Sequence, residues 1–173
     1  MLSQGKAFKN KYSHLSDKVV DVNTGEVKIG VGEVVLRSNA IGSCIVVVVY
    51  NPEARTGGLA HIMLPGASRN KKVNTKYADD AILELLDKLL NLGIPKSKLT
   101  ACVVGAGNVL KRENETLCMA NINYVTGLLE RFDIPVNAQS LGGVERRSVV
   151  LDVATGTVNY TIGDGAVKNL WQY

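Results

Sequence analysis

The chain has 173 residues, which suits a single domain with a core large enough to be stable without disulfides or metals. Its hydrophobic fraction of 46% is typical of a globular protein, and its formal charge of +4 comes without a dense basic run, which gives nucleic-acid binding little support. No apolar stretch reaches the roughly 18 residues of a membrane span, and residues 1–14 lack the apolar centre of a secretory signal.

Cysteine usage and the N-terminus predict the compartment and the domain organisation. Cys44, Cys102 and Cys118 form neither a CxxC pair nor an even disulfide framework. Free thiols are typical of a reducing compartment, so we expect a cytoplasmic protein. Residues 1–18 are polar and basic and predict an N-terminal extension, and residues 19–173 are then expected to form one domain.

The first half of the chain is rich in short strands. The stretch VVDV, the turn NTG and the stretch EVKIGV predict a hairpin, because Gly25 supplies the positive φ that a tight turn needs. VGEVVLRS follows, and IVVVVY at 45–50 is apolar at every position, which indicates a strand covered on both faces. After the turn NPEARTGG, LAHIML at 59–64 predicts a second strand.

Two amphipathic helices are expected. The first begins near Thr75 and ends before Gly93 and Pro95, with apolar residues at helical spacing: Ala78, Ile82, Leu85, Leu89 and Leu92. The second spans roughly Ala120 to Phe132, and one of its faces carries Ile122, Val125, Leu128 and Leu129.

Strands also separate and follow these helices. LTACVVGA lies between them and embeds Cys102, whereas Cys118 follows a charged loop and is expected to be partly exposed. IPVNAQSLGG, RRSVVLDV and TVNYTIG predict the closing strands, and AVKNLWQY predicts a docking tail whose Trp171 packs on the domain or on a partner. Many short strands with two separated helices predict an α+β fold with helices layered on sheets.

Cys44 and His61 each allow two interpretations. Cys44 follows a Gly-Ser turn and begins an apolar run, so it is either a buried strand residue or a thiol held at a glycine-rich corner. His61 lies in an apolar strand and is either a core histidine or a base. The other histidine, His14, lies in the polar extension, where a fixed geometry is hard to hold.

Together the two residues predict a nucleophilic site. A cysteine nucleophile needs a neighbouring base, and two strands joined by a turn bring the ends of 44–50 and 59–64 together. Gly42 and Ser43 allow a bend whose backbone N–H groups can face an oxyanion, and Ser38 offers a hydroxyl to orient the imidazole. One histidine with scattered cysteines does not make a metal site.

The same residues resemble the CheD family of chemoreceptor glutamine deamidases. GSC at 42–44 and GGLAHIMLP at 57–65 resemble the family's motifs, and the spacing from Cys44 to His61 is the family's own. The resemblance continues through KYADDAI at 76–82, VVGAGNVL at 103–110, Asn123, LGG at 141–143, Arg147, VVLD and TGTV at 155–158. It covers roughly residues 27 to 160.

The resemblance implies a three-layer α/β/β sandwich similar to the catalytic domain of cytotoxic necrotizing factor. It also implies a Cys-His-Thr triad at Cys44, His61 and position 38, where this chain has Ser38. Further departures are Ala120 and Arg146 where glycine is usual, and Ser140 where aspartate is usual.

The implied activity is deamidation of glutamines on the cytoplasmic helical bundle of a chemoreceptor, through a thioester on Cys44 and without a cofactor. Methyl esters at the same sites are possible further substrates. The resemblance also implies a CheC-type phosphatase as a partner, and a non-catalytic docking role beside that phosphatase is the main alternative. A third interpretation is a thiol hydrolase of small amides.

Overall fold

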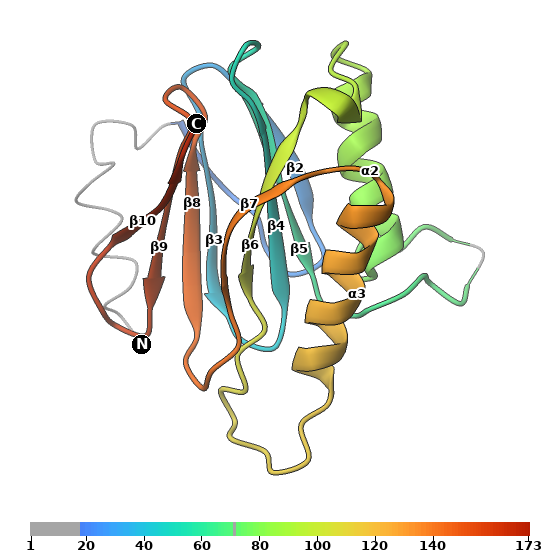
Figure 1. Ribbon diagram of the computed structural model, residues 1–173, viewed down its shortest axis with the longest axis vertical. Helices are drawn as coiled ribbons and strands as arrows, with labels where there is room; N and C mark the ends of the chain where they lie inside the picture. Colours follow the sequence, from blue (N-terminus) through green and yellow to red (C-terminus); the bar gives the residue numbers. More distant parts are fainter. Residues whose placement is uncertain (1–17, 71) are drawn as a thin grey trace.

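The computed structural model describes residues 18–70 and 72–173, which form an α+β fold (Figure 1). Sheet A consists, in spatial order, of β1 (Val19–Asp21), β3 (Val35–Ile41), β8 (Arg147–Asp152), β9 (Thr157–Ile162) and β10 (Lys168–Gln172). Sheet B consists of β2 (Val27–Val31), β5 (Thr56–Ile62), β4 (Ile45–Asn51), β6 (Thr100–Gly105) and β7 (Val136–Leu141). The helical elements are α2 (Ala78–Leu90), α3 (Leu117–Arg131) and the short 3-10 helix η2 (Lys96–Lys98).

The described residues form three layers, sheet A, sheet B and the pair of helices, which follow one another from left to right in Figure 1. One apolar cluster lies between the two sheets and includes Val46, Val48, Leu59 and Leu151. A second cluster joins the other face of sheet B to the helices, through Val47, Ala60, Leu85 and Val125. Sheet B is therefore covered on both faces, which explains why β4 is apolar at nearly every position.

Strands β4 and β5 pair as the sequence predicts. They are antiparallel, and Val46 lies opposite His61 while Ile45 lies opposite Ile62. β5 begins earlier than expected, at Thr56, because Gly57 and Gly58 belong to the strand rather than to the turn before it. A Cβ on Gly57 would lie 2.6 Å from the Val49 carbonyl oxygen, so the strand needs glycine there.

A bulge in β3 sets which of its side chains face the inter-sheet core. Ser38 pairs with Val149 and Ile41 pairs with Arg147, so β3 carries one extra residue between these pairs. Ala40 within the bulge has a φ of 53°. Because the extra residue reverses the alternation, Ser38 and Ile41 are both buried although they are three positions apart.

The predicted N-terminal hairpin is wrong, although its turn is present. Gly25 has a φ of +80°, as a tight turn requires. However, β1 pairs parallel with β3 in sheet A, and β2 pairs antiparallel with β5 in sheet B. Val22 is buried between the sheets, so the chain crosses from one sheet to the other at this turn instead of folding back on itself.

Both helices have the predicted apolar faces but different starts. α2 begins at Ala78 rather than near Thr75, because residues 74–77 form a turn closed by a hydrogen bond from Tyr77 N to Asn74 O. Leu92 lies beyond its end and is 51% exposed. α3 begins at Leu117 rather than Ala120, because the Glu115 carboxylate accepts hydrogen bonds from the amides of Leu117 and Cys118.

Two further expectations change at the C-terminus and at Cys118. The predicted docking tail is the edge strand β10, which pairs antiparallel with β9, so Trp171 lies on the domain itself. Cys118 is 6% exposed rather than partly exposed, and Cys102 is buried in the inter-sheet cluster as predicted.

The predicted extension lies outside the described residues except for Lys18. None of the described helices is long and apolar enough to cross a membrane.

Candidate active site

Cys44 lies at the corner between β3 and β4, where the chain passes from sheet A to sheet B. Its side chain packs against the inter-sheet cluster but remains half-buried, as do Gly42 and Ser43 before it. Among the described residues, the amides of Ser43 and Cys44 donate to no backbone carbonyl. The corner therefore combines a reachable thiol with two adjacent backbone donors.

His61 and Ser38 meet across the two sheets behind this corner. The Ser38 hydroxyl lies 2.8 Å from His61 Nδ1 and donates a hydrogen bond of 2.8 Å to the carbonyl oxygen of Val22. Because the hydroxyl has one proton and gives it to Val22, it accepts the proton of Nδ1. The remaining ring nitrogen, Nε2, then carries the lone pair of a neutral imidazole, which is the form that acts as a base.

The register brings Cys44 close to His61 on one face of sheet B. Cys44 precedes the Val46–His61 pair by two residues and packs on the same face of sheet B, so it is a diagonal cross-strand neighbour of His61. The Thr24 hydroxyl lies 3.5 Å from His61 Nε2 and also acts on the thiol of Cys44. The imidazole, the thiol and the Thr24 hydroxyl thus form one cluster.

Burial determines the resting charge of the pair. Desolvation raises the pKa of the Cys44 thiol, opposed by the Thr24 hydroxyl and by the amide of Cys44 itself. Desolvation also lowers the pKa of His61, which is 2% exposed, against smaller opposing effects of the Val22 carbonyl and Glu26. Both shifts favour a neutral thiol beside a neutral imidazole at pH 7, so the imidazole is ready to accept the thiol proton.

Asn121 on α3 braces the corner. Its side-chain amide donates to the carbonyl oxygens of Ser43 at 3.0 Å and Met63 at 3.1 Å, which joins the corner to the end of β5. Asn121 is fully buried, and its Oδ1 has no hydrogen-bond partner among the described residues. The unpaired Oδ1 costs free energy, while the two hydrogen bonds of the amide nitrogen fix the peptide that precedes Cys44.

The segment after β6 supports the corner from the other side. Ala106 N donates to Cys44 O and Gly107 N donates to Gly42 O. Gly105 has a φ of +125°, and a Cβ there would collide with the Cys44 carbonyl oxygen. The glycine is therefore required for the backbone of the β6 end to approach the cysteine closely.

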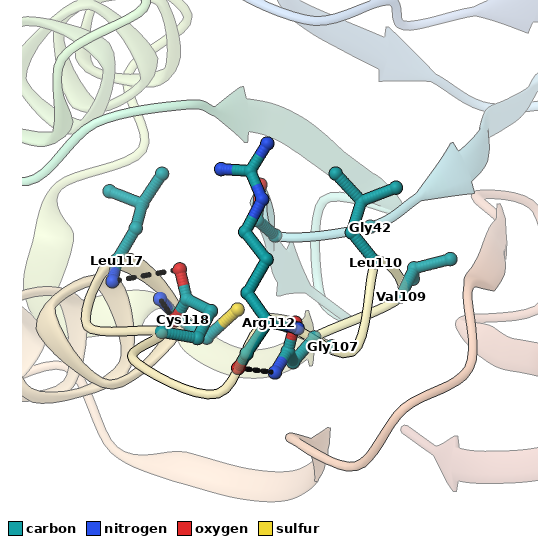
Figure 2. A pocket seen from close by; sticks show the side chains of 10 residues that line it. Gly42, Gly107, Val109, Leu110, Arg112, Leu117 and Cys118 are labelled. Atoms are coloured by element: carbon teal, nitrogen blue, oxygen red, sulfur yellow. Dashed lines mark hydrogen bonds between the residues drawn. The ribbon is translucent and has the colours of Figure 1, made fainter.

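A pocket of about 290 Å³ lies beside the corner and is lined by Gly42, Ser43, Arg112, Glu115 and Cys118 among others (Figure 2). Arg112 projects into it, and the sulfur of Cys118 points toward it. Val109 and Leu110 also line it and are 37% and 72% exposed. Cys44 does not line this pocket, so the pocket adjoins the thiol through the Gly42–Ser43 peptide rather than enclosing it.

The structure brings together Ser38, Cys44 and His61, the three residues that the sequence predicted, and places Gly42 and Ser43 at the corner before the thiol. It adds Thr24 and Asn121, which the sequence did not predict. No sequence signal pointed to Thr24, because the pattern around it predicts only a hairpin turn. None pointed to Asn121 beyond its position in an amphipathic helix. His14 lies outside the described residues.

Two of the departures from the family pattern have structural consequences. Ser140 accepts a hydrogen bond of 2.9 Å from Arg147 Nε, so the buried guanidinium has a hydroxyl where an aspartate would supply a charge. Desolvation lowers the pKa of Arg147 accordingly. Arg146 forms an exposed ion pair with Asp164 at 2.6 Å.

Within residues 18–70 and 72–173, no group of three or more His, Cys, Asp or Glu side chains is placed to hold a metal ion.

Fold and site together define an α+β protein that brings a cysteine, a histidine and a serine to one end of two packed sheets. The family model described as CheD chemotactic sensory transduction matches residues 63–161. A Chlorobium luteolum protein named probable chemoreceptor glutamine deamidase CheD is 35% identical over 152 residues, which cover 87% of this chain and 76% of the relative.

Two other relatives extend this comparison. A Methanococcus vannielii protein with the same name is 32% identical over 155 residues, covering 88% of this chain and 99% of the relative. A Thermotoga maritima protein named chemoreceptor glutamine deamidase CheD is 30% identical over 135 residues, covering 74% and 86%. The chain belongs to the CheD family.

Proposed function

We propose that this protein is a chemoreceptor glutamine deamidase of a chemotaxis system, with Cys44 as nucleophile, His61 as general base and acid, and Ser38 as the residue that orients the imidazole. The observation that carries the proposal is the hydrogen bond between Ser38 and His61 Nδ1, which leaves Nε2 of the neighbouring imidazole unprotonated. Family membership supports the substrate, since the relatives are named for that activity.

The reaction proceeds in two halves. His61 Nε2 takes the thiol proton while the sulfur attacks the side-chain carboxamide carbon of a protein glutamine. The N–H groups at the Gly42–Ser43–Cys44 corner donate to the oxyanion, each contributing about 3–4 kcal/mol to the transition state. His61 then gives its proton to the departing ammonia and a thioester remains. Water, deprotonated by the same imidazole, attacks the thioester, and glutamate and the thiol are released.

The surface around the corner favours a protein substrate over a small amide. Val109 and Leu110, which line the pocket beside the corner, expose apolar side chains to solvent. Exposed apolar side chains gathered next to a reactive group are typical of a surface that binds another protein. We propose that the helical bundle of a receptor binds there, and that a CheC-type phosphatase is a second protein partner.

Three further assignments belong to the same proposal. Residues 19–173 act as one catalytic domain, the layering corresponds to that of the cytotoxic necrotizing factor catalytic domain, and the protein works in the cytoplasm, where its thiol stays reduced. The free states of Cys44, Cys102 and Cys118 support that compartment.

The test is deamidation of a receptor fragment. The purified chain is incubated with the cytoplasmic fragment of a chemoreceptor, and peptides are searched by mass spectrometry for the roughly one-dalton change from amide to acid. We expect the change at specific glutamines, its loss in Cys44→Ala and its retention in Cys102→Ala, which removes a buried thiol away from the corner. Activity in Cys44→Ala would refute the nucleophile, and a chain that binds the receptor or CheC without deamidation would support the docking alternative.

A further inference from the structure

The turn at residues 22–26 is fastened to His61 itself. Gly25 N donates to His61 O at 2.8 Å, and His61 N donates to Glu26 O at 3.0 Å. The Glu26 carboxylate in turn accepts the amide of Asn23 at 2.8 Å, which closes the turn. The backbone of His61 therefore holds this turn in place. As a result, the side chain at the tip of the turn has a defined position next to the imidazole of His61.

Thr24 occupies that tip. It is exposed to solvent, and its hydroxyl lies 3.5 Å from His61 Nε2, the ring nitrogen that Ser38 leaves free. The same hydroxyl lowers the pKa of the Cys44 thiol, because a hydroxyl donor near the sulfur favours the thiolate. In the described part of the chain, no other side chain forms a hydrogen bond with Thr24 Oγ1. One hydroxyl therefore lies beside the imidazole nitrogen that receives the proton and also affects the thiol that gives it.

We propose that Thr24 is a fourth catalytic residue, whose hydroxyl stabilises the thiolate–imidazolium pair that forms when Cys44 gives its proton to His61. This inference rests on the proposed function of the Cys44–His61 pair. A hydroxyl has one proton to donate and two lone pairs. Before Cys44 gives its proton to His61, the Thr24 hydroxyl donates weakly to Nε2. After the proton has moved, the hydroxyl accepts from Nε2–H and donates to the sulfur anion.

The proton balance is simple. The thiol proton moves to Nε2, and the Thr24 hydroxyl keeps its own proton while reorienting by rotation about its C–O bond. A contact of 3.5 Å is at the limit of a hydrogen bond between neutral groups, and it strengthens when the imidazole becomes a charged imidazolium. The hydroxyl therefore stabilises the thiolate–imidazolium pair more than the neutral resting pair. Catalysis requires this kind of selective stabilisation.

Two titratable groups also act on the pair. Glu26, on the same turn, raises the pKa of His61, and Cys118 on α3 interacts electrostatically with Cys44. Neither contacts the Thr24 hydroxyl through a hydrogen bond in the described residues, so a change at Thr24 leaves both in place.

The chain supplies its own matched control. The stretch DVNTGEV at 21–27 has a counterpart DVATGTV at 152–158, in which Thr155 and Gly156 correspond to Thr24 and Gly25. Thr155 is also exposed, but its hydroxyl pairs with Thr157 Oγ1 at 2.8 Å in the β8–β9 turn. Thr155→Val therefore makes the same chemical change in the same kind of turn away from the thiol.

The experiment measures the rate of Cys44 alkylation by iodoacetamide as a function of pH, with the modified peptide identified by mass, alongside deamidation of the receptor fragment. We expect Thr24→Val and Thr24→Ala to slow alkylation at pH 7 by about 3- to 10-fold, to move its pH midpoint upward and to lower kcat by a similar factor with little change in KM. Thr24→Ser is expected to restore both, and Thr155→Val to leave both unchanged.

The outcomes separate this inference from the function on which it rests. If the parent chain deamidates the receptor through Cys44 while Thr24→Val matches it in alkylation and in kcat, the role of Thr24 is refuted and the deamidase stands. If the parent chain deamidates nothing but Thr24→Val still shifts the alkylation profile, the hydroxyl acts on the thiol and the proposed function fails. Equal melting temperatures of parent and variants exclude unfolding as the cause.

Discussion

The Ser38 hydroxyl and His61 Nδ1 lie 2.8 Å apart although Ser38 belongs to sheet A and His61 to sheet B. Both side chains are almost completely buried, at 1% and 2% exposure. The hydrogen bond therefore connects the two sheets through the site, and the relative position of the sheets determines which imidazole nitrogen is left unprotonated. The stability of the inter-sheet core and the chemistry of the thiol are linked at this bond.

Removal of the Ser38 hydroxyl should reduce activity without abolishing it. Ser38→Ala leaves His61 Nδ1 and the Val22 carbonyl without their shared partner, so we expect a deamidation rate about 10- to 100-fold lower and a loss of about 1–3 kcal/mol in the free energy of unfolding. Ser38→Thr keeps the hydroxyl and should retain most of the rate. Single-turnover deamidation and urea unfolding measure the two effects, and an unchanged rate in Ser38→Ala would remove Ser38 from the site.

The pH dependence of deamidation should show a broad plateau. Burial lowers the pKa of His61 from its ordinary value of 6.5, so the base stays neutral down to a lower pH and the acid limb of kcat/KM falls below 6.5. Burial raises the pKa of Cys44 from 9.0, so the alkaline limb lies above 9.0. A rate that already declines as the pH falls from 7.5 to 6.5 would contradict this, because it would show that the pKa of His61 is not lowered.

The Glu26→Gln variant should move only the acid limb of the pH profile of kcat/KM. Its carboxylate raises the pKa of His61, so Glu26→Gln should lower that pKa further and shift the acid limb of kcat/KM to lower pH. Glu33→Gln is the control, because Glu33 is an exposed carboxylate paired with Lys18. An acid limb that moves equally in both variants would mean that net charge, rather than Glu26, sets the shift.

Asn121 should matter more than its neighbour Asn123 on the same helix. Asn121→Ala leaves the carbonyls of Ser43 and Met63 without their donor, so we expect a loss of about 1–3 kcal/mol in the free energy of unfolding and a lower deamidation rate. Asn123 is exposed, and Asn123→Ala should leave the free energy of unfolding within about 0.5 kcal/mol. Denaturant unfolding of both variants checks this, and equal losses would show that the brace has no special role.

Two glycines give a matched test of the corner. A Cβ at Gly105 would collide with the Cys44 carbonyl at a φ of +125°, so Gly105→Ala should cost about 2–5 kcal/mol and displace the nucleophile. Gly127 lies within α3 with open space around it, so Gly127→Ala should raise the free energy of unfolding by about 0.5–1 kcal/mol. Thermal unfolding and iodoacetamide labelling of Cys44 measure both effects, and an unperturbed thiol in Gly105→Ala would contradict the first.

Local patterns predicted much of the fold. The apolar run at 45–50, the spacing of Ile82, Leu85 and Leu89, and the positive φ at Gly25 are properties of neighbouring residues, and each is present in the structure. Errors arose where distant segments compete for the same backbone. The turn at 22–26 bonds to His61 instead of closing a hairpin, and the predicted tail pairs with β9 as an edge strand.

The sequence by itself determined the chemical groups of the candidate site, because the Gly-Ser-Cys corner, the strand bearing His61 and the family resemblance are all written in order along the chain. Only the tertiary structure decided that Val22 and Ser38 fix the imidazole tautomer, that Asn121 braces the corner and that Thr24 reaches His61 Nε2. These relationships depend on how two sheets and a helix pack together. Such packing brings together residues that are far apart in the sequence, and no periodic pattern of neighbouring residues reveals these contacts.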